Sequence, residues 1–242
     1  MIEKNLIQFI ILKDKIIIVT GGSGLIGTAI VEDLKSEGAK VYNFDIIDNY
    51  DINNLTSISG FISNNNITHV DGVVNNAYPR TDDFGLDVEN EGISTFSGNL
   101  HLQLGGLHQF TKQMIPFLKD SKGSVVNIAS IYGIVGNDFS LYEGTNLTSP
   151  AAYCAIKGGT INLTRYMASY YGKQGIRFNC VSPGGILDKQ DKVFIQNYNN
   201  KCPMGRMGNP KDISQPVSFL LSDKASYITG QNLAVDGGWT AI

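Results

Sequence analysis

The sequence feature that most constrains the fold is a run of β-branched residues followed directly by a glycine-rich turn. Residues 16–19 (IIIV) are typical of a strand that is buried on both faces of a parallel sheet. Residues 20–27 (TGGSGLIG) follow at once, and a helical pattern then continues to Glu37. A strand, a glycine turn and a helix in this order predict a dinucleotide-binding unit, with the phosphates at the helix N-terminus.

The glycines of this turn have distinct predicted tasks. Gly21 permits a tight turn, Gly24 leaves room for a pyrophosphate beside the backbone, and Gly27 lets the helix pack closely on the strand. A merely flexible turn is the alternative, which the flanking strand and helix disfavour. The cofactor-binding residues predicted here are Gly21, Ser23, Gly24, Leu25, Ile26 and Gly27.

Asp45 ends the next predicted strand, residues 40–45. A carboxylate at this position accepts hydrogen bonds from the adenosine ribose hydroxyls and repels a 2′-phosphate. No Lys or Arg stands at Ser23 or just after Asp45 to neutralise such a phosphate. The sequence therefore predicts NAD(H) in preference to NADP(H), with a solvated strand-end aspartate as the alternative.

The rest of the chain continues to alternate strands and helices. Asp51 follows Asp45 too closely for a crossover helix, so we expect a shortened strand or a loop there. The fold class predicted is α/β, a doubly wound parallel sheet of Rossmann type in three layers, forming one domain over residues 1–242. The dinucleotide-binding half would span about 16–78 and the catalytic and substrate-binding half about 94–242. Further strands are expected at 70–76, 124–130, 176–182 and 232–236, helices at 54–65, 94–119, 150–171 and 210–221, and a mobile polar flap at 188–207.

Tyr153 and Lys157 lie one helical turn apart on one face of a predicted helix. A free tyrosine loses its proton near pH ~10, which is too high for a base at neutral pH. A lysine ammonium nearby favours the phenolate and lowers that pKa. The pair therefore suits proton transfer to or from a hydroxyl while a hydride moves to or from a nicotinamide. Alone, this spacing is common on helix surfaces.

Composition excludes several other classes of protein. With 42% hydrophobic and 17% charged residues, the chain reads as an ordinary globular protein. A net charge of −3 without a basic run gives no reason to expect nucleic acid or a membrane as partner. The three cysteines match no zinc or disulfide spacing, so no metal is predicted. The apolar run 6–12 is too short to span a bilayer and has no cleavage site, which favours the cytoplasm.

Together, six features resemble the short-chain dehydrogenase/reductase family over nearly the whole chain. They are the glycine turn at 20–27, Asn75-Asn76-Ala77, Ser130 at a strand end, Tyr153 with Lys157, residues 179–184 (NCVSPG) and residues 230–238 (GQNLAVDGG). The small and amide side chains at 75–77 also suit the ligand crevice at the carboxyl ends of parallel strands.

The resemblance implies a role for individual residues. Tyr153 would be the general acid/base, Lys157 would lower its pKa and hold the nicotinamide ribose, and Ser130 would hydrogen-bond the substrate oxygen. The active-site asparagine of the family falls on Gln103, with Asn99 one turn earlier as the alternative. Cofactor contacts would come from Asp51 and Ile52 along the adenine, Asn76 and Ala77 in the crevice, and Pro183, Gly184 and Ile186 near the carboxamide.

The sequence also departs from the family pattern. Leu25 stands where the compact branch usually has glycine, and the resulting spacing is more like that of the epimerase and dehydratase branch. Tyr78 replaces the glycine that usually follows Asn-Asn-Ala. The segment between Ser130 and Tyr153 is longer than usual, with the excess at about 137–148.

Because both ends of this extra segment are fixed at the catalytic pocket, we expect it to rise over the pocket. Its polar residues Tyr142, Glu143 and Asn146, together with Tyr78, are the predicted substrate contacts. They favour a hydroxyl-rich ligand such as a sugar or polyol; a passive surface loop is the alternative. The loop is also similar to that of bacterial oxidoreductases linked to surface-sugar or flagellin-glycan pathways.

The leading functional prediction is an NAD-dependent alcohol dehydrogenase or carbonyl reductase acting on a small-molecule substrate. One alternative is a sugar-nucleotide epimerase or dehydratase that retains its NAD, and another is a non-catalytic dinucleotide sensor. The resemblance further implies a homo-oligomer, a tetramer or a dimer, formed through the two long helices.

Overall fold

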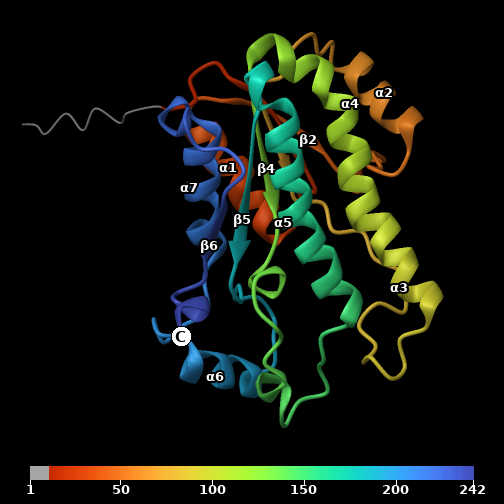
Figure 1. Ribbon diagram of the computed structural model, residues 1–242, viewed down its shortest axis with the longest axis vertical. Helices are drawn as coiled ribbons and strands as arrows, with labels where there is room; N and C mark the ends of the chain where they lie inside the picture. Colours follow the sequence, from red (N-terminus) through yellow and green to blue (C-terminus); the bar gives the residue numbers. More distant parts are fainter. Residues whose placement is uncertain (1–10) are drawn as a thin grey trace, which may run out of the picture.

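The structure, a computed structural model, describes residues 11–242 and is built on one sheet of six parallel strands. The β-branched runs predicted as strands form it, in the spatial order β2-β1-β3-β4-β5-β6 (Figure 1). The predicted α/β class and doubly wound parallel sheet are therefore confirmed. The strands are β1 (Ile16–Thr20), β2 (Lys40–Phe44), β3 (Gly72–Asn75), β4 (Ser124–Ile128), β5 (Arg177–Pro183) and β6 (Asn232–Val235).

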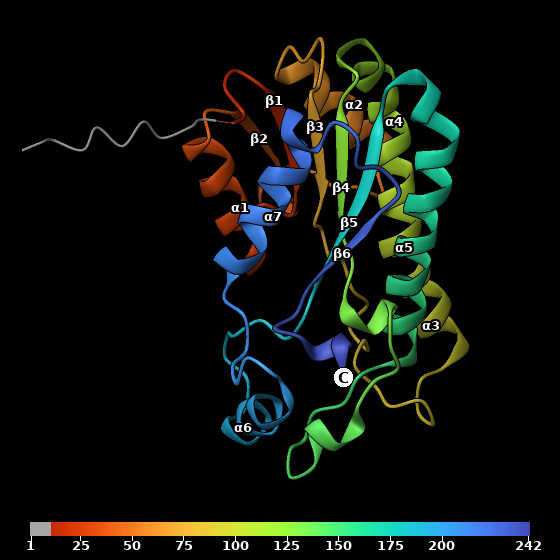
Figure 2. The same cartoon turned by 60° about the vertical axis from the view of Figure 1, so that its left-hand side comes forward.

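Helices cover both faces of the sheet, giving three layers. Helices α1 (Leu25–Ser36) and α7 (Pro210–Leu221) lie side by side on one face (Figure 2). The other face carries α2 (Leu55–Asn64), α4 (Gly106–Ser121) and α5 (Ala151–Tyr171). Neighbouring residues of β1 serve the two layers in turn, because side chains alternate along a strand. Ile18 packs in the α2/α4/α5 core, whereas Ile17 and Val19 pack in the α1/α7 core.

The order of the strands places a crevice beside β1. The chain runs from β1 to β2 on one side and then crosses to β3 on the other, so the connections leave β1 in opposite directions. Ligands of open parallel sheets bind at such a switch point, outside the carboxyl ends of the strands. The glycine turn at 20–27 and Asn76 both lie at this edge. No strand contains Asp51, as predicted.

The predicted mobile flap at 188–207 is wrong in its main part. Helix α6 (Lys192–Lys201) forms there and lies across the carboxyl-terminal end of the sheet, near the C-terminus (Figure 1). Tyr198 is buried, its ring stacks 4.6 Å from that of Trp239, and its hydroxyl accepts a hydrogen bond from the Gly185 amide at 2.8 Å. Because most residues of this segment are polar, its sequence did not indicate a packed helix, although two aromatic residues, Phe194 and Tyr198, anchor it.

The long helix predicted over 94–119 is interrupted. It consists of α3 (Ile93–Asn99), a π-helical stretch (Leu100–Gly105) and α4. Of the apolar run at 6–12, residues 6–10 lie outside the described residues, and Leu12 is fully buried. Within residues 11–242, no helix is long and apolar enough to cross a membrane.

Candidate active site

Ser130, Tyr153 and Lys157 converge at the carboxyl end of β4. Ser130 directly precedes a 3-10 turn (Ile131–Gly133), and its hydroxyl caps that turn by accepting from the Tyr132 amide at 3.2 Å. The turn packs hard against α5: a Cβ on Gly133 would lie 2.7 Å from the carbonyl group of Lys157. Glycine at this position therefore brings the serine up to the helix that carries Tyr153 and Lys157.

Aromatic rings surround Tyr153. The rings of Tyr78 and Tyr132 meet it edge-on, with centroids 5.9 and 6.4 Å away. Tyr142 lies near enough to Tyr132 to raise the pKa of its hydroxyl, so one residue of the loop at 137–148 lies beside this cluster. Lys157 Nζ lies 5.6 Å from the centre of the Tyr153 ring and 5.4 Å from that of Tyr78. Sequence reasoning missed Tyr132, although its position two residues after Ser130 could have indicated it.

Burial dominates the electrostatics of the Tyr153–Lys157 pair. It raises the pKa of Tyr153, against the hydrogen bond from Ser130, which lowers it. Burial also lowers the pKa of Lys157 to about 8, and its Nζ donates to the Ile128 carbonyl at 3.0 Å. The attraction between the two groups, taken alone, predicts a lowered pKa for Tyr153. In the structure the shift goes the other way, because desolvation disfavours the charged form of both groups.

Lys157→Met is expected to stabilise the cofactor-free protein at pH 7. A folded-state pKa of about 8, below the ordinary 10.5, means that the charged lysine opposes folding below pH 8. This penalty disappears as pH rises from 8 toward 10.5, where the unfolded chain binds more protons than the folded one. Urea unfolding should therefore show a stability gain for the variant at pH 7 that shrinks at pH 9.5. Lys35→Met, on an exposed part of α1, is the control, and a gain independent of pH would contradict the assignment.

Gln103 and Asn99 differ in whether their side-chain amides are free to bind a further group. Asn99 donates to Thr81 Oγ1 at 2.7 Å and to the Thr95 carbonyl at 2.8 Å, and it accepts from the Thr81 amide. Gln103 is only 5% exposed, yet neither atom of its amide has a hydrogen-bond partner among the described residues. It lies in the π-helical stretch, a local geometry that is frequent at functional sites.

Hydrogen bonds join the glycine turn to the residues that follow β3. Thr20 Oγ1 accepts from the amides of Asn76 and Ala77, both at 3.1 Å, and Asn76 Nδ2 donates to the Gly21 carbonyl at 2.7 Å. Gly21 has a φ of +65°, a conformation that favours glycine. Sequence reasoning missed Thr20, although it stands directly before the turn.

Gly27 and Gly24 differ in how closely other atoms of the protein surround them. A Cβ on Gly27 would lie 2.1 Å from the Gly21 carbonyl oxygen, so only glycine fits where α1 meets the turn. A Cβ on Gly24 would meet no atom closer than 3.5 Å. Nothing within the protein therefore demands glycine at position 24, and the bare backbone there leaves room for an approaching group. This fits a phosphate site at the start of α1.

Asp45 joins the end of β2 to the same turn. Its carboxylate accepts from the amides of Ser23 at 2.8 Å and Ile47 at 3.1 Å. Asn43, a residue that sequence reasoning missed, accepts from the Gly22 amide and donates to the Ser23 hydroxyl. The predicted ribose-binding carboxylate therefore stands beside the predicted phosphate turn.

The remaining cofactor candidates lie on segments that flank this edge. Ile52 is buried and its carbonyl accepts from Gln109 of α4 at 3.2 Å, while Asp51 caps the turn that follows it. After Pro183, a Cβ on Gly184 would lie 2.6 Å from the Tyr198 hydroxyl, so α6 closes directly over this turn. Ile186 is buried and pairs with Gly208 in an isolated bridge.

The extra loop at 137–148 packs against α6 and is held there by hydrogen bonds. Leu141 is fully buried against α6, and Asn197 donates to the carbonyls of Leu141 and Glu143. The Glu143 side chain is exposed, and Asn146 lines a cavity of about 390 Å³ together with Asp188. Among the described residues, no hydrogen bond joins either side chain to the Tyr153 cluster. Their role in substrate binding stays a prediction.

Residues 11–242 contain no group of three or more His, Cys, Asp or Glu side chains placed to hold an ion. All three cysteines are free thiols.

Comparisons with known proteins agree with this arrangement. The family model described as "Enoyl-(Acyl carrier protein) reductase" matches residues 28–240. The chain is 31% identical to post-translational flagellin modification protein A of Campylobacter coli, over 94% of this chain and 99% of that protein. A short-chain dehydrogenase from Leptospira borgpetersenii with bound NAD⁺ superposes with a TM-score of 0.85 at 36% identity, covering 99% and 97% of the two chains. A putative NAD(P)-dependent gluconate 5-dehydrogenase from Beutenbergia cavernae with bound NADP superposes with a TM-score of 0.81 at 27% identity, covering 97% and 100%.

Proposed function

The chain belongs to the short-chain dehydrogenase/reductase family of oxidoreductases, and on that premise we propose that it is an NAD(H)-dependent alcohol dehydrogenase or carbonyl reductase. Its reaction moves a hydride between the nicotinamide and a secondary alcohol or ketone. The convergence of Ser130, Tyr153 and Lys157 is the observation that carries this proposal. A dinucleotide sensor needs no such triad.

Each member of the triad has a distinct task. Ser130 donates a hydrogen bond to the substrate oxygen and steadies the charge that develops there. Tyr153 gives a proton to that oxygen during reduction and removes one during oxidation. Lys157, held by the Ile128 carbonyl, supports the phenolate and donates to the ribose hydroxyls. The bound nicotinamide supplies or accepts the hydride.

Gln103 takes the fourth position in this proposal. Its buried amide has both a donor and an acceptor without partners among the described residues, so it is equipped to hydrogen-bond a further polar group. Asn99, whose amide is engaged by Thr81 and Thr95, is assigned a structural role.

The residues around the switch point fit a nicotinamide dinucleotide. The space beside Gly24 suits the pyrophosphate, and Asp45, next to the Ser23 amide, suits the ribose hydroxyls. Asp51 and Ile52 are assigned to the adenine. Residues Asn76, Ala77, Pro183, Gly184 and Ile186 are assigned to the nicotinamide half. The position of Asp45 supports NAD(H) over NADP(H), because its carboxylate would repel a 2′-phosphate.

Titration of the protein with NADH and with NADPH, followed by cofactor fluorescence, tests the proposal. We expect NADH to bind at least about tenfold more tightly, which corresponds to roughly 1.4 kcal/mol of repulsion at the 2′-phosphate. Asp45→Asn should narrow this preference by weakening NADH binding and strengthening NADPH binding. Asp48→Asn, on the exposed turn that follows, is the matched control. Preference for NADPH in the unaltered protein would refute Asp45 as the ribose ligand.

The proposed substrate is a sugar, a polyol or a sugar-derived metabolite. The polar loop at 137–148 and the flagellin-modification name of a relative support this choice. Reduction of NAD⁺ in the presence of a panel of sugars and polyols, followed at 340 nm, tests it. Cofactor that stays bound through purification, without net NADH formation, would instead favour the NAD-retaining epimerase or dehydratase. Cofactor binding without turnover of any substrate would favour the sensor.

We also propose that the protein is a cytoplasmic homotetramer or homodimer that pairs through α4 and α5. The exposed and mutually stacked rings of Tyr166 and Tyr170 on α5 support this, because a stripe of aromatic surface is typical of interfaces. Light scattering tests the oligomeric state, and a monomer would refute it.

A further inference from the structure

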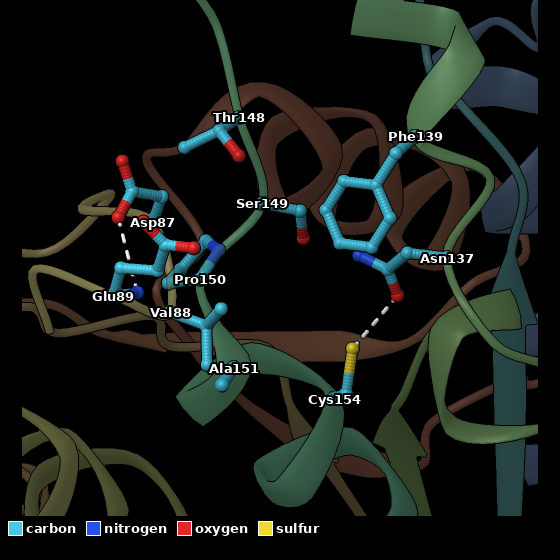
Figure 3. Close-up of a pocket in the computed structure, with 10 residues that line it drawn as sticks. All are labelled: Asp87, Val88, Glu89, Asn137, Phe139, Thr148, Ser149, Pro150, Ala151 and Cys154. Carbon is cyan, nitrogen blue, oxygen red and sulfur yellow. Dashed lines mark hydrogen bonds between the residues drawn. The ribbon is translucent and has the colours of Figure 1, made fainter.

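A second cavity lies at the first turn of α5, beside the Tyr153 cluster. Its volume is about 560 Å³. The segment at 87–89 forms one wall and the loop at 137–149 the other, with Ala151 and Cys154 at its base (Figure 3). Both walls follow strands that end at the proposed active site, since 87–89 comes after β3 and 137–149 after β4. Cys154 is the residue directly after Tyr153.

The cavity wall contains a buried polar group without a partner. Asn137 Oδ1 accepts from the Cys154 thiol at 2.7 Å, whereas its Nδ2 is buried and has no partner among the described residues. Figure 3 shows the Asn137 amide and the Phe139 ring on the same side of the cavity, with the Ser149 hydroxyl pointing into the space beside them. An unpaired buried N–H group is costly, so an acceptor oxygen placed here would gain a strong hydrogen bond.

The charges around the cavity restrict what it can take. Asp87 and Glu89 lie at its edge, and none of the described residues that line it is Lys or Arg. The two carboxylates therefore disfavour phosphate, sulfonate or carboxylate groups. The walls also include Val88, 71% exposed, and Phe139, 60% exposed. Apolar side chains so open to solvent would gain from being covered by an apolar portion of a ligand.

We propose that this cavity binds the distal arm of the substrate, and that this arm is uncharged and carries an amide carbonyl beside a small apolar group. The carbonyl oxygen accepts from Asn137 Nδ2, and the apolar group packs on Phe139 and Val88. Asn137 and Phe139 both line the cavity, so one arm can reach both of them. The inference rests on the proposed function, since it treats the ligand of this cavity as part of the substrate that Tyr153 acts on.

Protection of Cys154 from alkylation tests the proposal without measuring turnover. Cys180 and Cys202 are buried, so iodoacetamide should label Cys154 first, as followed by mass spectrometry of the NADH-bound protein. The probes are N-acetylglucosamine, glucose and glucose 6-phosphate. We expect N-acetylglucosamine to slow labelling several-fold at a concentration where glucose has a smaller effect and glucose 6-phosphate has none.

Two variants make the test specific. In each variant, the rate of Cys154 labelling with a probe is divided by the rate without a probe. In Asn137→Leu, N-acetylglucosamine should slow the labelling no more than glucose does. Val88→Lys, at an exposed position that tolerates substitution, should make glucose 6-phosphate protective by adding a cation to the wall. Equal protection by glucose and N-acetylglucosamine, or unchanged selectivity in both variants, would overturn the proposal. Absence of NADH binding would instead overturn the proposed function.

Discussion

Replacing Tyr153 with phenylalanine should lower kcat/KM by about 10²- to 10⁴-fold, the range that general acid–base groups contribute. The substitution removes the hydroxyl that lies beside Ser130 and leaves the ring in place between Tyr78 and Tyr132. The loss should therefore appear in the chemical step. NADH affinity, measured by fluorescence, should change by no more than about threefold, because less than 1 kcal/mol of cofactor contact is lost.

Tyr132→Phe is the matched control for this experiment. It removes a hydroxyl from the same aromatic cluster, one whose neighbour is Tyr142 of the loop at 137–148. We expect a smaller loss of kcat/KM, confined mainly to KM, as for a residue that shapes the pocket. Turnover retained in Tyr153→Phe, or an equal loss in both variants, would refute Tyr153 as the proton donor.

Gly27→Ala should destabilise the protein by about 3 kcal/mol or more, at the upper end of the usual cost of overpacking. The added methyl would lie 2.1 Å from the Gly21 carbonyl oxygen, which is backbone and cannot swing away. Alanine improves intrinsic helix propensity over glycine by only about 1 kcal/mol, so the steric conflict decides the outcome. Urea unfolding measures the loss.

Gly24→Ala provides the contrast. Its methyl would meet no protein atom closer than 3.5 Å, so stability should remain within about 0.5 kcal/mol of the unaltered protein. Cofactor affinity should nevertheless fall by about 10- to 100-fold, because a conflict of about 1–3 kcal/mol arises with the approaching pyrophosphate. Normal NADH affinity in this variant would show that the pyrophosphate does not pass over Gly24.

The sequence was sufficient wherever a local pattern fixes a backbone conformation. The run at 16–19 has to be a buried strand, and the glycine turn after it has to open a helix, because few other structures accommodate those residues in that order. Ser130 and the Tyr153–Lys157 pair could be placed for the same reason. Each stands at a recognisable strand end or on a defined helix face, and a parallel sheet brings the carboxyl ends of its strands to one edge.

Local patterns failed where long-range packing decides. Because the segment that forms α6 is mostly polar, its sequence did not indicate a helix. The helix is stabilised by Tyr198, which stacks on Trp239, 41 residues later in the chain, and accepts a hydrogen bond from the Gly185 amide. Within residues 11–242, the buried amide of Gln103 in the π-helical stretch has no hydrogen-bond partner, whereas the amide of Asn99 is hydrogen-bonded. The neighbours of these two residues in sequence do not reveal this difference.

The sequence by itself therefore determined the sheet and the glycine turn, and it pointed to Ser130, Tyr153 and Lys157 as the candidate reactive groups. Only the tertiary structure decided the environment of those groups. Burial raises the pKa of Tyr153 and lowers that of Lys157. Among the described residues, it also leaves Asn137 Nδ2 without a hydrogen-bond partner beside a cavity. The physical reason is that backbone conformation follows from neighbours in the chain, whereas desolvation depends on every segment that folds over a side chain.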